Sequence, residues 1–496
     1  MSLATTSHDL KSLIRSWHPI VVIETVEEER VRNLLTLVAA DLRIPLYEWS
    51  ITEGLRRHRS AAVFEGTESV TGLLRELRAI PNEGIFLLKD FSQHLSGGAV
   101  TRTFREIAQT FAKSSSVLIL TGDPVELPPE VEHKAVWLEL RLPDRDELRE
   151  IVQSTLVSLR GREKFELALE KGDGESLLRA LAGLTADQAR HVLGWVIFQD
   201  ARLDGSDVRR ILDRKREILE DGGLLDYYPL DDNRFEVGGF ARLKEWLARS
   251  QAGFSPRAAE YNLAPPRGIL IVGVQGCGKS LAAKFVAREW KLPLLKLDGG
   301  KLYDKYVGET ERNLRRAIDV AESMAPAVLW IDEIEKVFGH GAHSEYDAGL
   351  SRRIFGSFLT WLQEKKKNVF VVGAANDLLS VPPELLRKGR FDEIFFVDLP
   401  VAEERESIFE IHLRLRNQKP EAFDLGKLST AAEGFSGAEI EQAVIGSLYR
   451  AIHDKKEPST ELLLEEIAAT VPLSVSRAED VERIRRTAEG RFVNVR

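Results

Sequence analysis

The sequence predicts an α/β fold built around parallel sheets, and three observations support this class. Apolar runs at 268–272, 328–331 and 369–372 have the length and composition of buried strands. A glycine-rich octapeptide joins the first of them to residues 281–287, which have helical spacing. A similar order of apolar runs occurs in the first half of the chain, which predicts two modules in tandem.

The octapeptide 273–280 is the most informative stretch. Its glycines let backbone N–H groups converge on phosphate oxygens, and the following helix adds partial positive charge at its N-terminus. Lys279 is expected to reach the β- and γ-phosphates of ATP, and Ser280 to help hold Mg²⁺. The residues of this phosphate-binding loop expected to contact ATP are Gly273, Val274, Gln275, Gly276, Cys277, Gly278, Lys279, Ser280 and Leu281.

The overall composition fits a soluble globular protein of about two to four domains. A formal net charge of −9 over 496 residues argues against a protein that coats nucleic acid without regard to sequence. Cys277 is the only cysteine, so the chain has no internal disulfide and a reducing compartment is expected. We find no signal peptide at 1–8 and no apolar run near the roughly 18–20 residues of a membrane span, and therefore expect a cytoplasmic protein.

An acidic pair follows the second buried strand. Asp332 and Glu333 come directly after 328–331, and Asp332 lies 53 positions after Lys279. Asp332 is expected to bind the Mg²⁺ shell, and Glu333 to polarise the water that attacks the γ-phosphate. Such a pair alone is mostly structural, but with a phosphate loop at this spacing we interpret it as catalytic.

Three further polar residues are candidates for catalysis. Asn376 follows the strand 369–372 and can hydrogen-bond the attacking water or the γ-phosphate, although a lone Asn there is more often a turn residue. Arg387 and Arg390 are three residues apart and fit a pair that stabilises charge on a neighbouring subunit's γ-phosphate. Without the other motifs, a solvated basic turn would be the better interpretation.

Together these motifs resemble, in order and spacing, those of the AAA-family ATPases, over about residues 235–470. Val237-Gly238-Gly239 resembles the start of the family's module, which implies that Gly238 lies near the adenine. Residues 434–439 resemble the family's lid motif, and 351–353 the segment that faces the adjacent subunit. The resemblance implies a P-loop NTPase core with a helical lid.

One more segment has a counterpart in related ATPases. Tyr306, Val307 and Gly308 resemble the triplet that lines the ring pore and grips an extended polypeptide. The alternative is that Tyr306 packs within its own module. The chain departs from the family pattern at Val274-Gln275 and Lys388, where prolines are common, but these positions lie outside the chemistry.

The first half of the chain resembles the second half at an offset of 248 positions, as in the match of 45–49 with 293–297. The catalytic groups are not retained. Phe91 stands in place of the glutamate, and the loop glycines and lysine become Thr25, Glu28, Arg30 and Val31. We interpret this half as a degenerate AAA module that neither binds ATP tightly nor hydrolyses it; an unrelated Rossmann-like domain is the alternative.

A decayed module followed by an intact one resembles a bacterial and plastid group of uncharacterised AAA-domain proteins, of the hypothetical chloroplast reading frame (Ycf) type. The predicted parts are a degenerate module at 1–215, a linker at 216–235, an ATPase core at 236–402, a helical lid at 403–475 and a basic tail at 476–496. The tail is interpreted as a solvated end or, alternatively, as a contact with a neighbouring subunit.

Cys277 lies inside the phosphate loop and is expected to be a small filler residue. The helix N-terminus beside it is expected to lower the pKa of its thiol. Thiol reagents should then react with it, and bound ATP should protect it.

The main functional hypothesis is a ring-forming, Mg²⁺-dependent ATPase, hexameric when ATP is bound, that remodels a protein client. The alternative is an ATP-operated regulatory switch or scaffold with slow turnover and no threading. A nucleic-acid motor fits the acidic balance poorly. The sequence identifies neither a client nor a regulatory partner.

Overall fold

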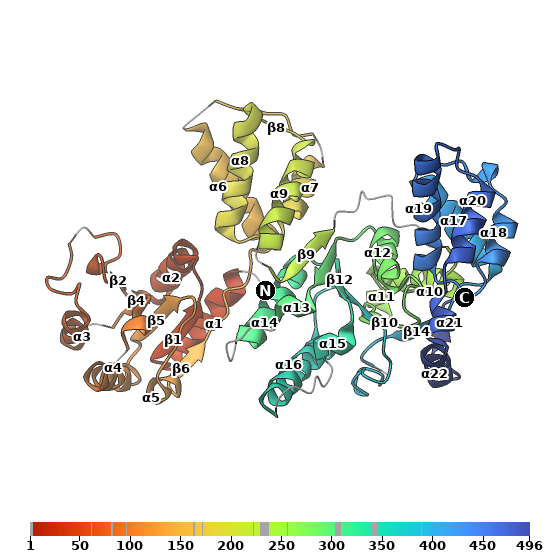
Figure 1. Cartoon of the computed structure of the whole chain (residues 1–496). Helices are drawn as coiled ribbons and strands as arrows, with labels where there is room; N and C mark the ends of the chain where they lie inside the picture. The colour runs from red at the N-terminus through yellow and green to blue at the C-terminus, as the bar shows by residue number, and fades with distance from the viewer. Residues whose placement is uncertain are drawn as a thin grey trace. The chain divides into compact units, whose positions relative to one another are not determined.

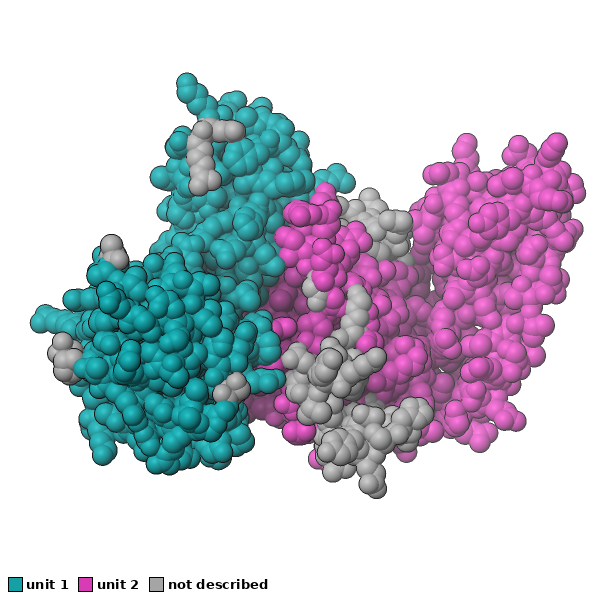
Figure 2. Space-filling model, turned by 60° about the vertical axis from the view of Figure 1, so that its left-hand side comes forward, with its two compact units in different colours: residues 1–211 teal, residues 212–496 magenta. Residues whose placement is uncertain are grey.

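The computed structural model divides the chain into two compact units, Met1–Ile211 and Leu212–Arg496 (Figure 2). The described residues are 3–60, 62–80, 83–95, 97–161, 164–170, 172–221, 223–228, 238–254, 256–302, 309–338, 345–387 and 389–496. The predicted α/β class is confirmed, because each unit has a largely parallel sheet flanked by helices (Figure 1). In the described part of the chain, no helix has an apolar stretch of sufficient length to span a bilayer.

The first unit has a six-stranded sheet that is parallel except for one hairpin. Its strands, from edge to edge, are β3 (Gly54–Arg57), β2 (Leu46–Ser50), β4 (Ile85–Lys89), β5 (Val117–Gly122), β1 (Ile20–Glu24) and β6 (Ala135–Trp137). The flanking helices are α1 (Leu3–Arg15), α2 (Glu28–Leu42), α3 (Val70–Ala79), α4 (Gly98–Phe111) and α5 (Pro129–Glu132), with a 3₁₀ turn η1 (Phe91–His94).

A helical group follows this sheet. It contains α6 (Arg145–Arg160), α7 (Asp173–Leu181), α8 (Ala186–Asp200) and α9 (Asp207–Asp221), and a short pair of strands, β7 (Glu166–Leu167) and β8 (Arg202–Leu203). Capping boxes begin α6 at Asp144 with Glu147 and α8 at Thr185 with Gln188, so two orphan N–H groups at each helix start have partners.

The second unit has a seven-stranded sheet in which only β9 runs antiparallel to its neighbour. Its order is β15 (Val493–Asn494), β14 (Glu393–Val397), β10 (Gly268–Gly273), β13 (Val369–Ala375), β12 (Ala327–Ile331), β11 (Leu294–Leu297) and β9 (Leu225–Tyr228). β10, β12 and β13 are buried along their whole length, as their continuous apolar runs predict for central parallel strands.

Helices cover both faces of this sheet, and a helical lid follows it (Figure 1). The covering helices are α10 (Ala241–Ser250), α11 (Pro256–Glu260), α12 (Lys279–Trp290), α13 (Gly299–Leu302), α14 (Glu309–Ser323), α15 (Ile334–Phe338) and α16 (Glu345–Glu364), with a 3₁₀ turn η2 (Gln251–Phe254). The lid consists of α17 (Ala402–Leu415), η3 (Pro420–Ala422), α18 (Leu425–Ala431), α19 (Gly437–Asp454) and α20 (Thr460–Ala469), which enclose an apolar core of their own.

The C-terminal tail is not a solvated end, and that interpretation is wrong. Residues of the tail form α22 (Ala478–Ala488) and β15, preceded by the short α21 (Leu473–Ser476). β15 pairs in parallel with β14, and Val495 is buried in the core of the second unit. The physical reason is that Val481 and Val495 bury apolar surface there.

The two large sheets share one strand order. In each, five parallel strands lie so that the fifth in chain order neighbours the first, followed by the fourth, third and second. The sheet of the first unit adds β3 beside its second strand, whereas that of the second unit adds β9 there and β15 at the opposite edge.

Candidate functional site

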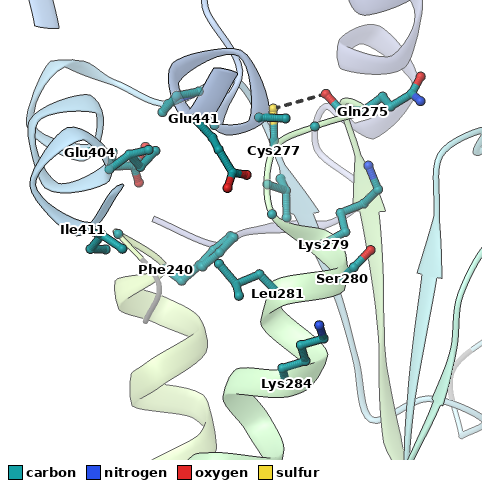
Figure 3. Close-up of a pocket in the computed structure, with 18 of the residues that line it drawn as sticks. Phe240, Gln275, Cys277, Lys279, Ser280, Leu281, Lys284, Glu404, Ile411 and Glu441 are labelled. Carbon is teal, nitrogen blue, oxygen red and sulfur yellow. Dashed lines mark hydrogen bonds between the residues drawn. The ribbon is translucent and has the colours of Figure 1, made fainter. Parts of the chain in front are cut away.

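A cavity of about 1030 Å³ opens in the second unit, at the carboxyl end of the central strands. The loop 275–278 and the start of α12 form one side, and residues of the lid helices α17 and α19 form the other; Gly273 and Val274 are not among the lining residues. Figure 3 shows Lys279, Ser280 and Lys284 on one side of this space and Glu404, Ile411 and Glu441 on the other. The sequence-predicted loop therefore lines one side of this cavity.

The loop needs glycine at two positions because atoms of the sheet and the lid approach it closely. Gly273 has φ of 148°, and a Cβ there would lie 1.9 Å from the carbonyl oxygen of Val397. Gly276 has φ of 77°, and a Cβ there would lie 2.9 Å from Ser436 Oγ at the start of α19. Ala438 N donates to the Gly276 carbonyl at 3.0 Å. The loop thus contacts both the sheet and the lid through its backbone.

Lys279 is held over this loop. Its Nζ donates to the carbonyl oxygens of Gly273 at 3.0 Å and Val274 at 2.7 Å, and the residue is only 5% exposed. Burial lowers the pKa of Lys279 to about 8. The ammonium therefore lies at the mouth of the loop, where phosphate oxygens could replace the two carbonyls.

Ser280 and Asp332 lie next to each other, as predicted. Ser280 Oγ donates to both carboxylate oxygens of Asp332 at 3.5 Å, and Lys296 Nζ lies 3.8 Å from Asp332 Oδ2. A hydroxyl and a single carboxylate are hard oxygen donors of the kind that fits Mg²⁺ bound together with substrate phosphates. Among the described residues, no group of three or more His, Cys, Asp or Glu could hold a metal ion.

Glu333 and Asn376 are also brought together. Glu333 has φ of 47°, in the left-handed region, which places its side chain at the end of β12 facing the end of β13. Its Oε1 accepts from Asn376 Nδ2 at 3.3 Å and from Lys336 Nζ at 2.8 Å. Both Glu333 and Asn376 line the cavity, so a carboxylate base and an amide lie within reach of one another.

Glu335 was missed by the sequence reasoning. Its Oε1 accepts the backbone N–H of Asn376 at 2.9 Å and of Asp377 at 3.4 Å, and the residue is 6% exposed. Its Oε2 has no hydrogen-bond partner among the described residues, and burial raises the pKa of Glu335. The carboxylate fixes the segment that carries Asn376; the signal in the sequence is an acidic residue two positions after Glu333.

The two predicted arginines do not line this cavity. Arg387 is exposed, and Arg390 is partly buried with no hydrogen-bond partner for Nη1 among the described residues. Tyr306, Val307 and Gly308, the predicted pore segment, lie outside the described residues, as do Val237 and Lys388.

The lid side of the cavity carries residues that the sequence did not single out. Arg416 Nη2 donates to Glu441 Oε1 at 2.7 Å, and His412 Nδ1 lies 3.7 Å from the same oxygen. Burial lowers the pKa of His412. Gly238, which was predicted, lines the cavity here, and a Cβ on it would lie 3.1 Å from Ile408. His412 and Arg416 lie one turn apart at the end of α17, a spacing that also suits a solvated face.

The expectation that the pKa of the Cys277 thiol is lowered is wrong. The residue is 9% exposed, and burial raises the pKa of its thiol to about 12. The charge of Lys279 lowers that pKa, but the loss of solvent outweighs it, and the carboxylates of Asp398 and Glu439 add to the increase. Its Sγ–H donates to the Gln275 carbonyl at 3.7 Å (Figure 3), so it acts as the small filler that was also predicted.

In the first unit, buried charged side chains lie around the segment between β1 and α2. Glu27 accepts the N–H of Ala186, the first residue of α8, at 2.7 Å. Arg30 lies 3.2 Å from Glu27 and 3.0 Å from Glu147, and all three side chains are buried. A carboxylate and its ion pairs thus occupy the space in front of a helix N-terminus.

Three family models that match this chain describe AAA ATPases. The family model "ATPase family associated with various cellular activities (AAA)" matches residues 269–399. The models "SpoVK-like AAA ATPase, N-terminal domain" and "SpoVK-like AAA ATPase, second domain" match residues 6–140 and 146–222.

Three similar proteins are each named "Uncharacterized AAA domain-containing protein ycf46". That of Pyropia yezoensis is 37% identical over 98% of this chain and 99% of its own length. That of Trieres chinensis is 36% identical over 94% and 93%, and that of Guillardia theta 35% over 96% and 93%.

Proposed function

The chain belongs to the AAA ATPase family, alongside these uncharacterised relatives, and from that premise we propose that it is a Mg²⁺-dependent ATPase with one catalytic centre per chain. The observation that carries the proposal is the meeting of Lys279, Asp332 and Glu333 in one cavity. A phosphate ligand, a metal ligand and a base are the three groups that ATP hydrolysis needs.

Each residue of the cavity has a separate role in the proposed reaction. Lys279 would exchange the carbonyls of its own loop for β- and γ-phosphate oxygens, and Ser280 and Asp332 would hold Mg²⁺, which neutralises phosphate charge when bound. Glu333 would accept a proton from the attacking water, and Asn376, 3.3 Å from it, would orient that water.

We propose further that the first unit is a degenerate copy of the second. The shared strand order supports common architecture, and the buried Glu27 supports loss of nucleotide binding. Triphosphate would meet this carboxylate at the same place, and two like charges about 4 Å apart repel by roughly 1–4 kcal/mol. On this proposal residues 1–215 serve the assembly or a client without turning over ATP.

The remaining step of the proposal is assembly. Arg387 and Arg390 lie away from their own chain's cavity, which fits a role in the site of an adjacent subunit. A ring whose pore segment, Tyr306 to Gly308, grips a polypeptide would then remodel a protein client.

Mixing two inactive variants tests this proposal. Lys279→Ala should lose ATP binding, whereas Arg387→Ala/Arg390→Ala should bind ATP and lose turnover by about 10³-fold or more. Each is inactive alone, but a mixture should recover turnover, because the intact Lys279 of one subunit meets the intact arginines of the other. Lys366→Ala, an exposed change away from the cavity, is the control.

The outcomes separate the parts of the proposal. ATP binding by Lys279→Ala that equals wild type would remove the assigned site. Failure of the mixture to recover turnover would remove the shared site while leaving the ATPase. Full cellular function of Glu333→Gln would replace remodelling with an ATP-operated switch, because that variant should bind ATP without hydrolysing it.

A further inference from the structure

The C-terminal segment, residues 478–496, lies against residues 398–401, which connect β14 to the lid helix α17 and are called the hinge below. Val495 N donates to the Phe396 carbonyl at 3.1 Å, which extends the pairing of β15 with β14. The carbonyl of Val495 accepts the N–H of Arg242, at the start of α10, at 3.0 Å. Both backbone polar groups of Val495 are therefore hydrogen-bonded to the second unit, which fixes the end of the segment.

Two arginines of this segment hold the hinge itself. Arg485 Nη2 lies 2.9 Å from Asp398 Oδ1, directly after β14. Arg496 Nε lies 3.3 Å from Glu404 Oε2 on the first turn of α17, and its Nη2 donates to the Leu399 carbonyl. The side chains of Asp398 and Glu404 are only 17% and 16% exposed, so solvent screens these pairs less than it screens surface pairs.

Val495 and Arg496 also line the cavity, together with Asp398 and Glu404. This side lies across the space from Lys279 and Ser280 (Figure 3, at Glu404). Its carboxylates, Glu441 among them, would repel phosphate, so it suits the uncharged nucleoside part of a nucleotide. A guanidinium is planar, carries five donors and stacks on aromatic faces, which suits a base or ribose.

We propose that the C-terminal segment is a wall of the nucleotide cavity and that Arg496, held by Glu404, binds the nucleoside part of ATP. This inference rests on the proposed ATPase site. Binding is reciprocal: if a seated segment favours nucleotide, bound nucleotide favours the seated segment by the same factor. Occupancy of the cavity would thus be transmitted to α22 through Arg496, β15 and the hinge.

The test compares ATP with inorganic tripolyphosphate, both with Mg²⁺, on the full chain by calorimetry. Arg496→Ala should weaken ATP binding about tenfold and leave tripolyphosphate binding unchanged, because only ATP carries a nucleoside. Lys279→Ala should weaken both. Arg491→Ala is the matched control, since Arg491 is exposed in the same segment and does not line the cavity.

The outcomes are distinct. If wild type binds neither ligand, the proposed function fails. If wild type binds ATP and Arg496→Ala binds it equally well, or loses tripolyphosphate to the same extent, this inference alone fails. If Arg496→Ala does not fold, hydrogen exchange of the wild type decides: ATP should slow exchange of the amides of 493–496 at least several-fold, and unchanged rates would overturn the proposal.

Discussion

Replacing Glu335 tests how the catalytic end of the site is held. Its carboxylate accepts two backbone N–H groups, one at 2.9 Å from Asn376 and a weaker one at 3.4 Å from Asp377. Glu335→Ala leaves these donors without that acceptor, at about 1–3 kcal/mol for each buried group that stays unsatisfied. Because the second bond is long, we count mainly the first and expect about 2 kcal/mol of lost stability.

The same change should act on turnover through Asn376. A displacement of about 1 Å of a positioned group costs on the order of 10²-fold in rate, so kcat should fall about 100-fold. The KM for ATP should stay within about threefold, because Lys279 Nζ donates to the carbonyls of its own loop, whereas Glu335 accepts from Asn376 and Asp377. Glu335→Gln keeps an acceptor oxygen without its charge and should lose only about tenfold in kcat.

Steady-state ATPase assays over a range of ATP concentrations, with thermal melts of each variant, measure both effects. Glu364→Ala, an exposed carboxylate at the end of α16, is the control for removal of a negative charge. A lower melting temperature with wild-type kcat would show that Glu335 supports the fold and does not position Asn376. A raised KM at unchanged kcat would refute the assigned role equally well.

Three other outcomes are expected. Burial lowers the pKa of Lys279 to about 8 in the nucleotide-free chain, and phosphate favours the charged ammonium, so ATP binding should take up a proton near pH 8.5 and weaken by up to about tenfold per pH unit above that pKa. Calorimetry in buffers of different ionisation enthalpy measures this proton uptake, and an absence of uptake at pH 8.5 would contradict the role assigned to Lys279. Because the pKa of its thiol is about 12, Cys277 in the folded chain should react with iodoacetamide at pH 8 at least about 100-fold more slowly than in the urea-unfolded chain. Mass spectrometry measures both rates, and similar rates would mean that the thiol is exposed to solvent in the folded chain. Glu27→Ala removes a partner of both Arg30 and Ala186 N and should destabilise the first unit by about 3 kcal/mol in urea melts of the full chain, and an unchanged midpoint would show that the buried pair is dispensable.

The parts of the site that could be predicted lie in short continuous stretches. Residues 273–281 and the pair Asp332-Glu333 follow buried strands directly, so the order of strand, loop and helix along the chain predicts where they lie. The α/β class was predictable for the same reason, since β10, β12 and β13 are apolar along their whole length.

What could not be predicted depends on residues far apart in the chain. The pKa of Cys277 rises because the lid and hinge cover it, and Asp398 and Glu439 are more than a hundred positions away. β15 has two residues, too few for any alternation, and its partner Phe395 is almost a hundred positions earlier. Arg416 and Glu441 pair across two helices and look, in sequence, like solvated charges.

The position of β9 has a practical consequence for anyone who wants to isolate the catalytic half. This strand lies within the expected linker, yet it pairs with β11 through residues 225–228, and Tyr228 and Arg216 line the cavity. A fragment that starts at 236 would bare the unpaired N–H and C=O groups of β11, which invite edge-to-edge aggregation. Because α9 begins at Asp207, a start just before that residue keeps both the helix and the strand, and is the better choice for expression.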